Sequence, residues 1–141
     1  MIKRKADELI RNFILNDKRS LLVTGARQVG KTFLIRKVGK ECFDNVVEIN
    51  FVEQPDAIEL FSKQKGAKDF LLRLSAFAKK PLVPGKTLIF FDEVQECKEI
   101  ITAIKFLVDE GSYKYVMSGS LLGVELDDLR SVPVGYMDEI K

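Results

Sequence analysis

The sequence predicts an α/β fold in which a parallel β-sheet is covered by helices on both faces. Short apolar runs that suit buried strands alternate along the chain with longer segments whose apolar residues recur at helical spacing. The run Leu88 to Phe91 is apolar on successive residues, as expected of a strand covered on both faces. With 141 residues, 46% of them hydrophobic and 31% charged, the chain has the size and composition of one globular domain.

Each element has its own signal in the sequence. The spacing of apolar residues predicts helices, and breaks are expected at Asn16-Asp17, at Gly66 and in the turn from Pro81 to Gly85. Gly111 suits the end of a helix. The predicted strands cover residues 20–24, 46–51, 87–91 and 113–117, with a further extended candidate from Val132 to Ile140. The predicted helices cover residues 3–15 and 31–41, a segment that starts at Pro55, a segment from Phe70 to Ala78 and one from Ile100 to Gly111.

Composition excludes several kinds of site. The chain has no histidine, which excludes a histidine base, a histidine-ligated metal and a Ser-His-Asp triad. Cys42 and Cys97 have no metal-ligand spacing, so we expect reduced thiols in a cytoplasmic protein. No apolar run is long enough to span a membrane. The net charge of +2 does not by itself imply binding to nucleic acid or membrane. The basic clusters Lys3-Arg4-Lys5 and Lys18-Arg19 are either solvated or contact a polyanion.

One segment fits the Walker A pattern G-x-x-x-x-G-K-[ST], namely Gly25-Ala26-Arg27-Gln28-Val29-Gly30-Lys31-Thr32. It lies between a predicted strand and a predicted helix, the context in which this loop binds phosphate. The two outer glycines let successive backbone N–H groups surround a phosphate, and the helix adds its unpaired amides and dipole. The alternative is a glycine turn with an exposed lysine. The predicted nucleotide-binding residues are Gly25, Ala26, Arg27, Gln28, Val29, Gly30, Lys31, Thr32 and Phe33.

The ligands expected at this loop are ATP and Mg²⁺. Lys31 would reach the β- and γ-phosphates, and the Thr32 hydroxyl would ligate the metal. The strand at 87–91 runs into Asp92-Glu93, which is the Walker B pattern. Asp92 would hold Mg²⁺ and Glu93 would orient and polarise the attacking water. Such an acidic pair can also simply solvate a loop, but after a Walker A loop it favours hydrolysis over transfer to an acceptor.

A third polar segment, Ser118-Gly119-Ser120, follows the next predicted strand. One of its serines could hydrogen-bond the γ-phosphate or the attacking water, and the sequence does not separate Ser118 from Ser120. The alternative is a glycine turn with two small polar residues. Gln95 could help to position Glu93 or the phosphate, or could be an exposed residue at a helix start.

Three of these segments together resemble one family. They are G-A-R-Q-V-G-K-T at Gly25 to Thr32, F-F-D-E-V-Q at Phe90 to Gln95 and M-S-G-S-L-L at Met117 to Leu122. They resemble the AAA+-superfamily ATPases of bacteria and archaea, and more narrowly the group whose ATPase core is joined to a C-terminal domain of uncertain function. The similarity spans essentially the whole chain. It implies a three-layer P-loop NTPase fold with a five-stranded parallel sheet in the order 5-1-4-3-2.

The resemblance also implies a role for Arg27 near the phosphates or at a subunit contact, with a solvated side chain as the alternative. Two departures stand out. Where relatives commonly have Gly-Arg after the third motif, this chain has Gly135-Tyr136, and Arg130 cannot be assigned the arginine-finger role. The chain also stops where relatives continue into a helical lid. We therefore expect residues 1–141 to be an ATPase core from a longer protein, with weak binding and slow turnover.

The function expected from these observations is Mg²⁺-dependent ATP binding and hydrolysis that drives a conformational change in attached domains or in a partner. A nucleotide-binding switch without hydrolysis is the main alternative. A P-loop kinase would need an acceptor pocket and an arginine-rich lid, neither of which is found. A nucleic-acid motor ranks last because basic and acidic residues are interspersed. A homo-oligomer or a partner protein is compatible with the sequence, which leaves both undetermined.

Overall fold

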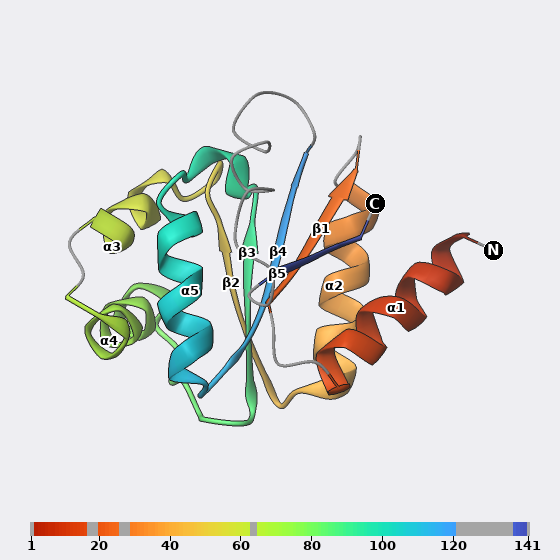
Figure 1. Cartoon of the computed structure of the whole chain (residues 1–141), viewed down its shortest axis with the longest axis horizontal. Helices are drawn as coiled ribbons and strands as arrows, with labels where there is room; N and C mark the ends of the chain where they lie inside the picture. Colours follow the sequence, from red (N-terminus) through yellow and green to blue (C-terminus); the bar gives the residue numbers. More distant parts are fainter. Residues whose placement is uncertain (1, 17–19, 26–28, 63–64, 121–136, 141) are drawn as a thin grey trace.

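In the computed structural model, a central β-sheet lies between two layers of helices (Figure 1). The structure describes residues 2–16, 20–25, 29–62, 65–120 and 137–140. Helices α1 and α2 cover one face of the sheet, and α3, α4 and α5 cover the other. None of the helices in these ranges is both long and apolar enough to cross a membrane. The helices are α1 Ile2–Asn16, α2 Val29–Cys42, α3 Glu59–Ser62, α4 Ala67–Ala78 and α5 Ile100–Glu110, with 3₁₀ turns η1 Pro55–Ile58 and η2 Val94–Glu96.

The sheet has the order β2-β3-β4-β1-β5, and its described strands pair in parallel. Read from the other edge, this is the predicted order 5-1-4-3-2, so the three-layer fold and its topology are confirmed. The order places β4 between β1 and β3. The strands are β1 Ser20–Gly25, β2 Asn45–Asn50, β3 Thr87–Asp92, β4 Lys114–Ser120 and β5 Met137–Ile140.

The apolar strands supply two separate cores because successive side chains point to opposite faces. On β3, Leu88 and Phe90 pack with α1 and α2, whereas Ile89 and Phe91 pack with α3, α4 and α5. All of these side chains are fully buried. Each contributes about 1.5–3 kcal/mol relative to leaving it exposed. A strand that serves two cores must be apolar at every position, which explains its continuous apolar run.

The structure corrects three predicted boundaries. Strand β4 extends through Ser120 because Ser118 and Gly119 continue the ladder with β1, so these residues are not the glycine turn of the alternative reading. Phe51 lies beyond β2 in a turn, where the Asn50 side chain accepts hydrogen bonds from the next backbone amides. The segment that begins at Pro55 forms a 3₁₀ turn before the short α3. Residues 132–136 of the extended candidate lie outside the described residues.

Helix α1 is fastened to α2 by ion pairs centred on Asp7. One carboxylate oxygen of Asp7 accepts a hydrogen bond from Arg11 on α1 and the other from Lys37 on α2, both at 2.7 Å. Arg11 also contacts Glu41 on α2 at 2.5 Å. The hydrogen bond from Lys37, followed by that from Arg11, lowers the pKa of Asp7. The ionised carboxylate is therefore the form that holds the two helices together.

We expect Asp7→Asn to lower the urea midpoint of unfolding at pH 7 and to have a smaller effect at pH 3. Because the folded-state pKa of Asp7 is lowered, the stability it contributes is full above its unfolded pKa of about 4 and is lost as the pH falls through the lower folded-state value. Asp44→Asn, at an exposed position, is the matched control. Equal shifts of the midpoint at both pH values would contradict this role.

Candidate active site

The predicted motif residues converge at one edge of the sheet. Parallel strands end at the same edge, and ligands of open α/β sheets bind there. Asp92 is the last residue of β3, and its register partner on β4 is Ser118. Thr32 lies in α2, which begins at Val29, shortly after β1 ends at Gly25. Alternation along the strands turns the side chains of Asp92 and Ser118 toward the α2 face, the same face as Phe90 and Val116.

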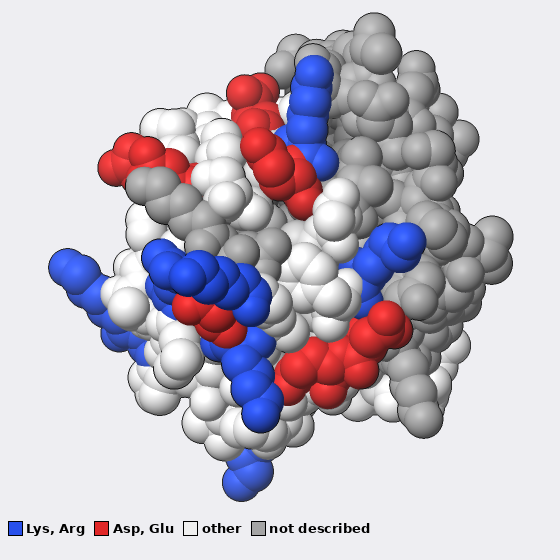
Figure 2. All heavy atoms as spheres, turned by 60° about the vertical axis from the view of Figure 1, so that its left-hand side comes forward, with Lys and Arg blue, Asp and Glu red and all other residues white. Residues whose placement is uncertain are grey.

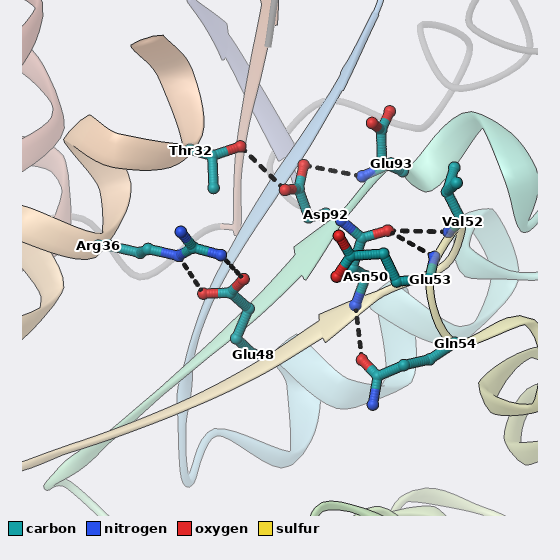
Figure 3. A network of polar contacts seen from close by, with 9 residues as sticks. All are labelled: Thr32, Arg36, Glu48, Asn50, Val52, Glu53, Gln54, Asp92 and Glu93. Carbon is teal, nitrogen blue, oxygen red and sulfur yellow. Dashed lines mark hydrogen bonds and ion pairs between the residues drawn. The ribbon is translucent and has the colours of Figure 1, made fainter. Parts of the chain in front are cut away.

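A hydrogen bond joins the two predicted metal ligands. The Thr32 hydroxyl donates to Oδ2 of Asp92 at 2.9 Å, across a sequence separation of 60 residues (Figure 3). The other oxygen, Oδ1, accepts a hydrogen bond from the backbone N–H of Glu93 at 2.9 Å. Asp92 is only 2% exposed, and this burial raises its pKa, partly offset by the two hydrogen bonds. The two hydrogen bonds thus fix the orientation of the Asp92 carboxylate, with the Thr32 hydroxyl beside it.

Glu93 has an unusual backbone conformation. Its φ angle is 58°, in the left-handed region that residues other than glycine rarely adopt. Such a conformation costs about 1–3 kcal/mol and is enriched at functional sites. The side chain is 8% exposed, and its Oε1 accepts a hydrogen bond from Nε2 of Gln95 at 2.8 Å. Gln95 is therefore not the exposed helix-start residue of the alternative reading, because it contacts Glu93 from η2.

Ser118 brings an unpaired hydroxyl to the same edge. Its side chain is fully buried, and its Oγ has no hydrogen-bond partner among the described residues. An unsatisfied buried polar group costs about 1–3 kcal/mol. In the register of the two strands, Ser118 lies directly beside Asp92.

A cavity of about 430 Å³ opens beside Thr32 and Asp92. Its lining adds three residues that the sequence analysis missed, Arg36, Asn50 and Glu53. Asn50 ends β2 at the same edge, and the rule that polar residues at strand ends meet there would have found it. Arg36 lies one turn after Thr32 and pairs with Glu48 through two bonds of 2.8 and 2.6 Å. Among the described residues, the lining therefore holds three carboxylates and one arginine that is already paired, which favours a cation.

The remaining predicted residues divide into three groups. Phe33 lines the cavity with 56% of its surface exposed. The backbones of Gly25, Val29, Gly30, Lys31 and Ser120 belong to β1, α2 and β4, which begin or end at this edge, and the roles of their side chains stay predictions. Outside the described residues lie Ala26, Arg27, Gln28, Arg130, Gly135 and Tyr136.

Comparison with known families gives one decisive match. The family model of the AAA domain matches residues 17–141, which is most of the chain. The chain belongs to the AAA domain family. This confirms the resemblance to AAA+ ATPases, and membership indicates a nucleotide-binding ATPase core. A search of curated proteins gave no match to this AAA domain.

Solved structures show the same fold. A DNA replication initiation factor and the replication initiator DnaA bound to AMPPCP and single-stranded DNA each match with a TM-score of 0.61 and 18% identity. Both matches cover 99% of this chain and 46% of the other chain. A variant of Thermotoga maritima RuvB matches with a TM-score of 0.51 and 18% identity, over 97% of this chain and 43% of the other. The chain thus spans less than half the length of these proteins.

Proposed function

We propose that this AAA domain binds ATP with Mg²⁺ and hydrolyses it, and that the hydrolysis drives a conformational change in attached domains or in a partner. The observation that carries the proposal is the 2.9 Å hydrogen bond between Thr32 and Asp92. It joins a residue of the Walker A motif to one of the Walker B motif at the edge where parallel sheets bind ligands. The family membership and the AMPPCP bound to DnaA support the choice of ATP.

Thr32 and Asp92 are the residues that would hold Mg²⁺. Oxygen ligands, few in number and supplemented by waters and phosphate oxygens, are what this ion prefers. The carboxylates around the cavity add a favourable potential for a cation. A bound Mg²⁺ would supply positive charge that offsets the negative charge of the phosphates during transfer.

The other site residues act on the phosphate and on the attacking water. The first turn of α2 offers backbone amides to the phosphates, and Lys31 adds a positive charge there. Glu93 orients the water and takes up its proton. The unpaired hydroxyl of Ser118 hydrogen-bonds the γ-phosphate or the water, a role for which Ser120 is the second candidate.

The proposal is tested by calorimetric titration of the chain with ATP and Mg²⁺, with phosphate release measured on the same sample. Binding together with release above the level of Glu93→Gln supports an ATPase. Binding without release contradicts hydrolysis and supports a nucleotide-binding switch. No binding contradicts both functions for this chain.

Lys31→Ala is expected to weaken ATP binding by about 10- to 150-fold, because a hydrogen bond to a charged group is worth about 1.5–3 kcal/mol. Lys40→Ala is the matched control, since Lys40 is an exposed lysine in the last turn of the same helix. Calorimetry at constant salt measures both variants. Equal affinity in the wild type and in Lys31→Ala would remove this lysine from the site.

Nucleic acid as a partner receives no support from the charge distribution. On the face seen in Figure 2, the basic and acidic side chains of the described residues are interspersed and form no stripe of one sign. DnaA is bound to single-stranded DNA, but the similarity of 18% identity extends to the fold alone. Binding of this AAA domain to single-stranded DNA with a steep salt dependence would overturn this part of the proposal.

A further inference from the structure

We propose that Gln95 is a positioning residue for the hydrolytic reaction: it fixes the carboxylate of Glu93 and is itself held in place by Gly119 of β4. The inference rests on the proposed ATPase function and extends it to a residue outside the Walker motifs. It connects the catalytic carboxylate to the strand that carries Ser118.

The first step is the contact between Gln95 and Glu93. Nε2 of Gln95 donates to Oε1 of Glu93 at 2.8 Å. A carboxylate only accepts hydrogen bonds, so the amide nitrogen must face Glu93 and the amide oxygen must face away from it. The bond restrains the end of a side chain that would otherwise rotate about three torsions. Gln95 therefore restrains one oxygen of the Glu93 carboxylate.

The second step is the contact between Gln95 and β4. A Cβ atom added to Gly119 would lie 2.7 Å from Oε1 of Gln95 and 3.3 Å from Cγ2 of Val94. The first distance is shorter than van der Waals contact allows, so a side chain at position 119 would displace the amide. Glycine at this position lets η2 pack directly against the strand.

The third step is the cost of this arrangement. Oε1 of Gln95 is buried and has no hydrogen-bond partner among the described residues. Glu93, the residue that Gln95 contacts, is held in the left-handed conformation. A strained backbone and an unpaired buried polar atom both lower stability, and their occurrence in neighbouring residues is expected at a site that is shaped for a reaction.

The test is a double-mutant cycle of Gln95→Ala and Gly119→Ala, read out as kcat, ATP affinity and thermal midpoint. A misplaced catalytic group lowers the rate by about 100-fold per ångström, so we expect each single variant to lose about 10- to 100-fold in kcat. ATP affinity should not change. Because the added methyl group acts by displacing Gln95, Gly119→Ala should change kcat by no more than about twofold in the Gln95→Ala background. Glu96→Ala, on the same 3₁₀ turn and exposed, is the control.

The outcomes separate this inference from the proposed function. Absence of phosphate release in the wild type overturns both. Release in the wild type that survives Gln95→Ala, losses that multiply in the double variant, or a parallel loss of ATP affinity overturn the positioning role alone. Should Gly119→Ala fail to fold, Gln95→Glu replaces it. That change keeps the volume of the side chain but sets a second carboxylate against Glu93, so kcat should fall at least as far as in Gln95→Ala.

Discussion

Glu93→Gln is expected to keep Mg²⁺-dependent ATP binding and to reduce phosphate release by at least about 100-fold, the lower limit for loss of a general base. The substitution removes the basic oxygen but preserves the shape of the side chain. The new amide can still accept the hydrogen bond that Gln95 donates to Oε1 of Glu93, so the turn should keep its conformation. The loss should therefore appear in kcat and not in affinity.

Calorimetry and phosphate release on the same samples measure this variant against Glu96→Gln. Glu96 lies on the same 3₁₀ turn but is exposed, and its replacement should leave both quantities unchanged. If Glu93→Gln hydrolyses ATP like the wild type, the assignment of the base is wrong. If it loses binding as well, the residue serves the fold of the site and not the chemical step.

The fold could be predicted from the sequence because its strands are strongly patterned. Strand β3 is apolar at each position from Leu88 to Phe91 because these alternate residues enter two different cores. The predicted strand ends differ from the observed ones where pairing with another strand determines how far a strand extends. Ser118 and Gly119 have low strand propensity, yet they belong to β4 because β1 offers the partners of the ladder. No local pattern predicts a pairing between strands so far apart in the chain.

The site was predictable in its motifs but not in its contacts. Asp92 and Thr32 were assigned to one metal from their motifs, and the structure joins them by a hydrogen bond. Arg36 and Glu53 were missed because charged residues on helices and turns are usually solvated, and only the fold shows which of them border the cavity. The left-handed conformation of Glu93 was equally hidden, since nothing in the residue type signals it.

The burial of Asp92 lowers the stability of the fold but suits the function of the site. Desolvation raises the pKa of this carboxyl, which means that the charged form is disfavoured in the folded chain without a cation. The two hydrogen bonds from Thr32 and the Glu93 backbone offset this effect only in part. A buried carboxyl is thus retained at some expense of stability, as expected of a group whose charge serves a ligand.

Asp92→Asn should therefore fold at least as stably as the wild type and lose the contribution of Mg²⁺ to ATP binding. The new amide can satisfy both present partners: its oxygen can accept from the Glu93 N–H, and its NH₂ group can donate to the Thr32 hydroxyl. The buried charge disappears, and with it the anionic oxygen that Mg²⁺ requires.

Thermal unfolding measures both effects. Without ligand, the midpoint should equal or exceed that of the wild type. With ATP, added Mg²⁺ should raise the midpoint of the wild type only, because a ligand stabilises in proportion to its affinity for the folded state. Asp109→Asn on α5 is the matched control. If added Mg²⁺ raises the thermal midpoint of Asp92→Asn as much as that of the wild type, the metal is held elsewhere.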